Sequence, residues 1–206
     1  MRKVILALFA ALVAAAPASA APNWLGMTGL ILTPSADALD AREWNVTFHH
    51  ITDTANIAAG NLGLARGLEA GLVFFDPEAR GADAELTGHA KYMVIPETAT
   101  GVGFAVGWWD FADQVDSSPY AVVSKRLRGD NEGPAFRVHV GGGGGIYDGI
   151  FAGAEANLTS NILAMVDYDG EDVNAGVRIG LPSGFRLDAA FVSEEFGIGA
   201  SYNARF

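Results

Sequence analysis

The stretch Phe196-Gly-Ile-Gly-Ala-Ser-Tyr-Asn-Ala-Arg-Phe206 follows a strict two-residue period. One parity is apolar, running from Phe196 through Tyr202 to Phe206, and the other holds only small or polar residues, with Arg205 its one charge. Successive side chains of a β-strand point to opposite faces. The stretch therefore predicts a β-strand with one apolar face and one polar face.

The same alternation recurs upstream. Val173 to Leu181 places valine, isoleucine and leucine on one parity and asparagine, glycine and arginine on the other. Stretches 57–65 and 118–127 alternate poorly. We expect about twelve strands (10–12), at residues 43–52, 57–65, 68–75, 84–94, 100–110, 118–127, 134–142, 149–159, 162–169, 172–181, 185–192 and 196–206.

The first twenty residues have the layout of a secretory signal peptide. Arg2 and Lys3 precede an apolar run from Val4 to Ala16, and Ala18-Ser19-Ala20 is an A-x-A cleavage site. The apolar run is short for a membrane-spanning helix. We expect export and cleavage after residue 20.

Composition narrows the class further. The whole chain has a formal charge of −11, and the part after residue 20 keeps 11 basic and 24 acidic residues, a charge of −13. This acidity disfavours nucleic acid as a partner. There is no cysteine, which excludes disulfides and a lipoprotein anchor. The 26 glycines, with no long amphipathic helical pattern, indicate an all-β protein.

The spacing of the strands favours a transmembrane barrel. Connections after even-numbered strands look short, as at 65–67, 160–161 and 182–184, whereas several after odd-numbered strands look long and polar. Strands of this length suit a tilted crossing, and a closed barrel pairs every backbone group. We predict an all-β, antiparallel, up-and-down outer-membrane β-barrel over residues 43–206, preceded by a periplasmic or plug segment at 21–42. A soluble β-barrel or sandwich is the alternative.

Two resemblances add to this expectation. A terminal strand closing on phenylalanine resembles the C-terminal signature of bacterial outer-membrane barrels, which implies that Tyr202 and Phe206 are read by the barrel assembly machinery. Residues 26–36, Gly-Met-Thr-Gly-Leu-Ile-Leu-Thr-Pro-Ser-Ala, resemble the opening motif of the YjbH family of outer-membrane barrels associated with exopolysaccharide production. The matching residues are Gly26, Gly29, Leu30, Ile31, Pro34, Ser35 and Ala36. The resemblance implies an exopolysaccharide-linked role, with polysaccharide, outer-membrane lipid and other envelope proteins as partners.

Polar residues on the inward parity are the candidate functional residues. They are suited either to line a narrow pore or saccharide path, or to fill a small lumen with ion pairs. Twelve strands lie between the eight that side chains just fill and the sixteen that leave a channel. The candidates are Glu69, Glu85, His89, Lys91, Arg137, His139, Glu155, Arg178, Arg186, Asp188 and Arg205.

No motif organises a catalytic or cofactor site. His49, His89 and His139 share the polar parity, but a metal site would also need them at matching heights. We therefore expect no metal, no cofactor and no enzymatic activity. Two alternatives remain: an outer-membrane enzyme with a lumen or loop active site, and a soluble periplasmic barrel that binds a ligand.

Overall fold

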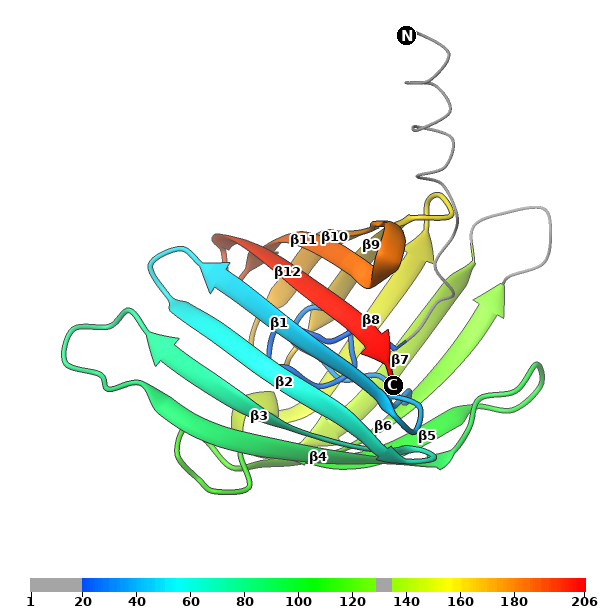
Figure 1. Ribbon diagram of the computed structural model, residues 1–206, viewed down its shortest axis with the longest axis horizontal. Helices are drawn as coiled ribbons and strands as arrows, with labels where there is room; N and C mark the ends of the chain where they lie inside the picture. The colour runs from blue at the N-terminus through cyan, green and yellow to red at the C-terminus, as the bar shows by residue number, and fades with distance from the viewer. Residues whose placement is uncertain (1–19, 129–134) are drawn as a thin grey trace, which may run out of the picture.

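The computed structural model describes residues 20–128 and 135–206, so all but the last residue of the expected signal peptide lies outside the described residues. The described chain forms one closed, twelve-stranded antiparallel barrel, in which each strand pairs with its neighbours in sequence (Figure 1). This confirms the predicted fold class. No helix in the described ranges is long and apolar enough to cross a membrane.

All twelve predicted strands are present, with ends within three residues of the expected ones. Two short 3-10 turns, η1 (Gly145–Tyr147) and η2 (Pro182–Gly184), lie between strands. The strands are β1 (Glu43–Ile51), β2 (Ala55–Ala65), β3 (Leu68–Pro77), β4 (Glu85–Ile95), β5 (Gly103–Trp109), β6 (Ser118–Arg128), β7 (Phe136–Gly143), β8 (Gly149–Asn157), β9 (Ile162–Tyr168), β10 (Val173–Gly180), β11 (Phe185–Val192) and β12 (Glu195–Arg205).

Strand β12 closes the barrel. It pairs with β11 on one side and with β1 on the other, where Glu43 lies opposite Arg205 and Ile51 opposite Gly197. We call the end where β1 begins and β12 finishes the terminal end, and the opposite end the distal end. No strand is left with an unpaired edge, which is the property that a barrel gains by closure.

The two faces of the wall have opposite character. The apolar parity points outward and stays exposed: Ile198 is 54% exposed, Leu72 is 61% and Val173 is 67%. The polar parity points inward and is buried, with Glu69, His89 and Lys91 at most 1% exposed. A soluble barrel has the reverse arrangement, because its core must be apolar.

The weak alternation of β2 and β6 has a structural cause. Both strands also place apolar side chains inward near the distal end, including Ile57, Tyr120 and Val122. Both parities of these strands are therefore partly apolar, which obscures the two-residue period. The inward apolar groups pack against chain inside the barrel.

The expected contrast in connection length is wrong. Terminal-end connections span 66–67, 96–102, 129–135, 158–161 and 181–184, and distal ones span 52–54, 78–84, 110–117, 144–148, 169–172 and 193–194. The two sets have similar lengths. Strand β5 starts at Gly103 rather than at residue 100, because Thr98 caps a turn that ends at Gly101, and Lys125 binds three carbonyls of that turn.

Candidate functional site: a plugged lumen

Residues 20–42 enter the barrel and return to its rim (Figure 1, dark blue), with 20–39 inside and 40–42 exposed at the terminal end. We call this segment the plug. It enters at the terminal end, where Asn203 donates to the carbonyl of Ala20, and returns there to start β1. Between these points it folds on itself through isolated antiparallel bridges that pair Pro22 with Thr28 and Gly29 with Pro34.

Glycine is required at two turns of the plug. Gly26 has φ +99, and a Cβ there would lie 2.8 Å from Cβ of Ala59 in the wall. A Cβ on Gly29 would lie 2.3 Å from the carbonyl oxygen of Thr33, inside the plug itself. Both lie in the stretch 26–36, which therefore contains two glycines that the plug conformation needs.

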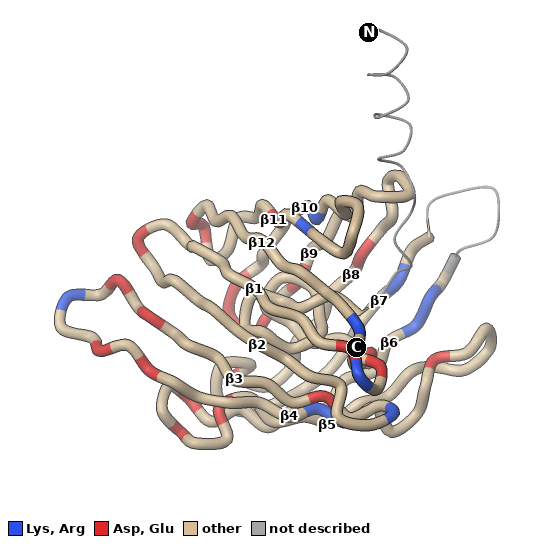
Figure 2. The backbone as a smooth tube through the Cα atoms, viewed as in Figure 1, with Lys and Arg blue, Asp and Glu red and all other residues tan. Residues whose placement is uncertain are grey.

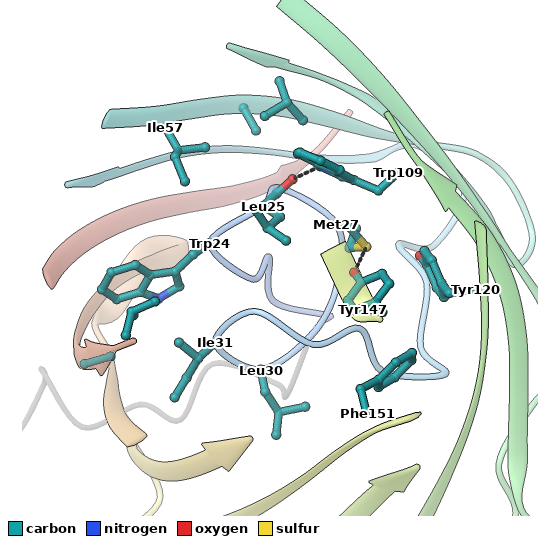
Figure 3. Close-up of a cluster of buried hydrophobic side chains, with 14 of the residues drawn as sticks. Trp24, Leu25, Met27, Leu30, Ile31, Ile57, Trp109, Tyr120, Tyr147 and Phe151 are labelled. Carbon is teal, nitrogen blue, oxygen red and sulfur yellow. Dashed lines mark hydrogen bonds between the residues drawn. The ribbon is translucent and has the colours of Figure 1, made fainter. Parts of the chain in front are cut away.

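The tip of the plug is apolar and occupies the distal half of the lumen. Figure 3 shows Trp24, Leu25 and Met27 fanning out towards the wall. Trp109 donates its indole N–H to the carbonyl of Leu25 at 3.0 Å, and the Tyr147 hydroxyl lies 3.7 Å from the sulfur of Met27.

Trp24 reaches the strand that closes the barrel. Its ring stacks on His49 at 4.7 Å between centroids, with 12° between the planes. A Cβ on Gly197 would lie 2.3 Å from the Trp24 ring, and one on Gly199 would lie 1.9 Å from the His49 ring. The small parity of β12 therefore makes room for these two rings.

The carboxylate of one wall residue accepts hydrogen bonds from a whole turn of the plug. Oδ2 of Asp167, on β9, accepts the backbone N–H groups of Ile31, Leu32 and Thr33 at 2.9 to 3.1 Å, together with the Thr33 hydroxyl. Its other oxygen accepts from Asn174 at 3.0 Å. Successive backbone N–H groups that converge in this way form an anion-binding nest.

Arg178, on β10, binds the carbonyls of the plug. Its Nη2 donates to Pro22 at 2.7 Å and to Leu30 at 3.1 Å, while its Nε donates to Asp188 at 2.6 Å. Asp188 also faces His49, at 3.6 Å. The guanidinium group is thus neutralised by the wall and hydrogen-bonded to the plug.

Lys91 and Glu69 form a second such pair, 3.2 Å apart and fully buried. Glu69 accepts the backbone N–H groups of Thr28 and Leu39, each at 2.8 Å, and the Thr28 hydroxyl. Lys91 donates to the Thr28 carbonyl at 2.6 Å. The two charges can be buried because they pair with each other and form their other hydrogen bonds with the plug.

The plug makes its own ion pairs with the wall at the terminal end. Asp37 receives two bonds from Arg137, which also binds Glu97 at 2.8 Å. Further out, Asp40 pairs with the exposed Arg205 at 2.6 Å. Burial raises the pKa of Asp37, but the hydrogen bond and charge of Arg137 outweigh burial and hold that pKa below its ordinary value.

The structure brings most of the predicted lumen residues together. Glu69, His89, Lys91, Arg137, His139, Arg178, Arg186 and Asp188 are buried and inward-facing. Glu155 is half-buried, 3.8 Å from both Arg137 and His139. Glu85 is half-buried at the distal rim, and Arg205 is exposed at the terminal rim, so neither reaches the middle of the lumen.

Sequence reasoning missed several residues that hold the plug, chiefly Asp167, Asn61, Ser124 and Trp109. Asn61 donates to the Gly26 carbonyl and contacts His89, while Ser124 accepts the N–H of Ala36 and contacts His139. Asp167 shares its parity in β9 with the apolar Leu163 and Met165, so alternation did not mark it as a polar lumen residue. Nothing in the sequence indicated that it faces a turn 134 to 136 residues away.

The three lumen histidines are held separately. His49 stacks on Trp24, His89 contacts Asn61 and His139 contacts Ser124. Within residues 20–128 and 135–206, no group of three or more histidine and acidic side chains is placed to hold a metal ion.

Charge is unevenly distributed along the barrel axis (Figure 2). In the distal ranges 51–55, 76–85, 110–118, 144–149, 168–173 and 192–195, Arg80 is the only basic residue. The acidic residues of those ranges are Asp53, Asp76, Glu78, Asp83, Glu85, Asp110, Asp113, Asp116, Asp148, Asp169, Glu171, Asp172, Glu194 and Glu195. The distal rim is therefore strongly negative.

A closed twelve-stranded barrel with an apolar exterior and a polar lumen has the porin type of fold. Two solved structures share it: "KdgM porin in complex with disordered oligogalacturonate", with a TM-score of 0.52 and 9% identity, and "KdgM porin", with a TM-score of 0.52 and 6% identity. Each alignment covers 80% of this chain and 99% of the other. No protein-family model and no curated protein matches the chain.

Proposed function

We propose that this protein is a non-enzymatic β-barrel of the bacterial outer membrane, with a lumen that its own N-terminal segment closes at rest. The observation that carries the proposal is the continuous apolar exterior around a buried, ion-paired interior. Exposed apolar surface on this scale is unfavourable in water and matches the hydrocarbon band of an outer-membrane barrel.

The aromatic residues on the exterior support this placement. Tyr92 lies near the terminal end and Trp108 near the distal end, both 48% exposed. At the terminal end, Tyr202 packs on Trp44 and on Phe185, and Phe206 is 65% exposed. Such rings are typical of the two membrane interfaces. With an even strand count, residue 20 and residue 206, the two ends of the described chain, both lie at the terminal end, which in this proposal faces the periplasm.

We further propose that the barrel handles exopolysaccharide, with the assembly machinery reading Tyr202 and Phe206. The proposal is supported by the position of residues 26–36, which resemble the YjbH opening motif and belong to the plug in the lumen. A deletion strain tests the role, since loss of capsule or biofilm polymer supports it and unchanged polymer contradicts it.

Membrane fractionation, combined with gel migration before and after heating, tests the barrel proposal. We expect the protein in the outer-membrane fraction, with a folded band that shifts on heating. Recovery in the soluble periplasmic fraction would contradict it. A second measurement, planar-bilayer conductance of the wild type, is expected to show only rare openings because the plug fills the lumen.

A further inference from the structure

Three ion pairs of the wall stay intact when the plug departs, whereas Asp167 then keeps only its hydrogen bond from Asn174. Lys91 keeps Glu69 at 3.2 Å, Arg178 keeps Asp188 at 2.6 Å and Arg137 keeps Glu97 at 2.8 Å. Stripping one partner from a buried ion pair is strongly destabilising, but none of these three pairs is broken by removing the plug. The plug is thus bound as a removable occupant.

Over residues 21–36 the wall binds an uncharged chain, whereas at the terminal end it pairs with the charged side chains of Asp37 and Asp40. Residues 21–36 contain no acidic, basic or histidine residue. Wall side chains hydrogen-bond to the backbone of these residues. They donate to carbonyls such as those of Pro22, Leu25 and Gly26. They accept from the N–H groups of Thr28 and of residues 31–33. The site therefore recognises closely spaced donors and acceptors on a neutral chain.

The plug does not use all the polar capacity of the wall. Among the described residues, six buried wall atoms have no hydrogen-bond partner: Asn45 Nδ2, His89 Nδ1, Tyr120 Oη, His139 Nε2, Asp188 Oδ2 and Ser201 Oγ. Of these, His139 Nε2 faces Glu155 at 3.8 Å and Asp188 Oδ2 faces His49 at 3.6 Å. Buried polar groups in native proteins are nearly always bonded, so groups left without partners need an explanation. A ligand with more hydroxyl groups than a peptide backbone supplies one.

Two further features narrow the class of ligand. The acidic distal rim repels polyanions and does not repel neutral solutes. Below that rim, Tyr120, Tyr147 and Phe151 form a mutual aromatic cluster inside the lumen, with ring centroids 4.7 to 6.4 Å apart. These rings offer apolar faces beside the hydroxyl of Tyr120.

We infer that the wall beneath the plug is a binding track for an uncharged oligosaccharide, and that the plug occupies this track when the sugar is absent. The inference rests on the proposed membrane barrel and deepens it by naming the substrate class. Sugar hydroxyl groups can both donate and accept hydrogen bonds, which suits a wall that presents both donors and acceptors. The acidic rim disfavours the entry of polyuronates.

The test needs the full chain with the plug displaced. The I31D variant places a carboxylate at a fully buried apolar position whose backbone N–H is bonded to Asp167 at 3.1 Å, and the cost of burying that unpaired charge expels the turn. I31V is the matched control, because it preserves the apolar contact. We expect I31D to conduct steadily in a planar bilayer while I31V stays as closed as the wild type.

Maltohexaose and a hexamer of galacturonate, added separately on the distal side, then probe the open lumen of I31D. We expect maltohexaose to block the current at a concentration at least tenfold lower than the uronate. Equal or tighter block by the uronate, block by neither sugar, or an I31D barrel that does not conduct would each overturn the inference. Failure of the protein to insert at all would instead contradict the proposed function.

Wall variants identify where the sugar binds. Y120F and S201A each remove a hydroxyl that has no partner now, so neither is expected to disturb the fold. In the I31D background each should raise the half-blocking maltohexaose concentration about 2- to 10-fold, the range expected for one hydrogen bond. Y92F, on the exposed exterior, is the matched control and should leave the block unchanged. Unaltered block in both wall variants would contradict the track.

Discussion

At the residue scale, Asp167 contributes most to the seating of the plug. Three consecutive backbone N–H groups and one hydroxyl converge on a single oxygen of its carboxylate. A carboxylate in this position satisfies donors that would otherwise be buried without partners. Each such orphaned donor costs about 1–3 kcal/mol.

We expect Asp167→Ala to loosen the plug while the barrel stays closed. A single cysteine at Ala36, in a chain with no other cysteine, reports this through its rate of maleimide labelling. D167A should raise that rate at least tenfold. The control variant D172N changes an exposed distal acid and should leave the labelling rate unchanged. Slow labelling of the D167A variant would contradict the role of Asp167 in holding the plug.

Gly197 tests the packing of Trp24 on the terminal strand. In Gly197→Ala the new methyl group would lie 2.3 Å from the Trp24 ring, so the ring or the strand must shift. Overpacking of this kind costs about 1–3 kcal/mol, which should lower the temperature at which the folded gel band is lost by about 2–10 °C. Gly60→Ala, where a Cβ meets nothing within 4 Å, is the control. Equal melting of the two variants would show that Trp24 does not pack there.

At the scale of elements, the strands could be predicted from the sequence. For residues 21–42 the sequence left open whether they form a periplasmic segment or a plug. Alternation marks a strand wherever the two faces differ, as in β12. The alternation is weak in β2 and β6, because inward-facing side chains of these strands that pack against the plug are also apolar. The plug itself has no period, because its backbone groups bond partly to wall side chains and partly to one another within tight turns.

The inward residues could be listed from parity, but not their partners. Parity placed Arg178, Lys91 and Glu69 in the lumen correctly. Their contacts with Pro22, Thr28 and Leu39 depend on how far the plug reaches into the barrel, and no local signal encodes that depth. The connection lengths misled for a related reason, since capped turns such as 96–102 shorten a strand without altering its pattern.

The terminal-end latch between Asp37 and Arg137 gives a pH dependence. Because the pKa of Asp37 in the folded protein lies below its ordinary value of 3.8, the latch is at full strength above about pH 5 and is lost as pH falls through the lowered pKa. We expect wild-type openings in a bilayer to be equally rare at pH 7 and pH 5. They should become more frequent below pH 4.

Asp37→Asn removes the charge of the latch and isolates its share of that response. D37N should open more often than the wild type at pH 7, and the difference should shrink as the wild-type carboxyl is protonated. A constant difference between the two proteins from pH 7 to pH 3 would show that Asp37 is not the titrating latch.

At the scale of the whole molecule, the barrel is polarised along its axis. The distal rim is acidic, the basic residues Arg42, Arg66, Lys125 and Arg205 lie at the terminal end, and the plug enters from the terminal end (Figure 2). An exterior suited to hydrocarbon and an interior filled by the protein's own chain describe a barrel that is closed at rest. Removal of the plug would leave the Lys91–Glu69, Arg178–Asp188 and Arg137–Glu97 ion pairs of the lumen in place.

Disulfide capture in the membrane tests the central claim, that the N-terminal segment lies inside the barrel, most directly. A Cβ at Gly103, on the wall, would lie 3.2 Å from Cβ of Ala36, close to the separation that a disulfide requires. In outer membranes, A36C/G103C is predicted to form an intramolecular disulfide, seen as blocked maleimide labelling that a reductant restores. A36C/G60C, with one cysteine on the exterior, should stay reduced. Free, labelled thiols in A36C/G103C would contradict a plugged barrel.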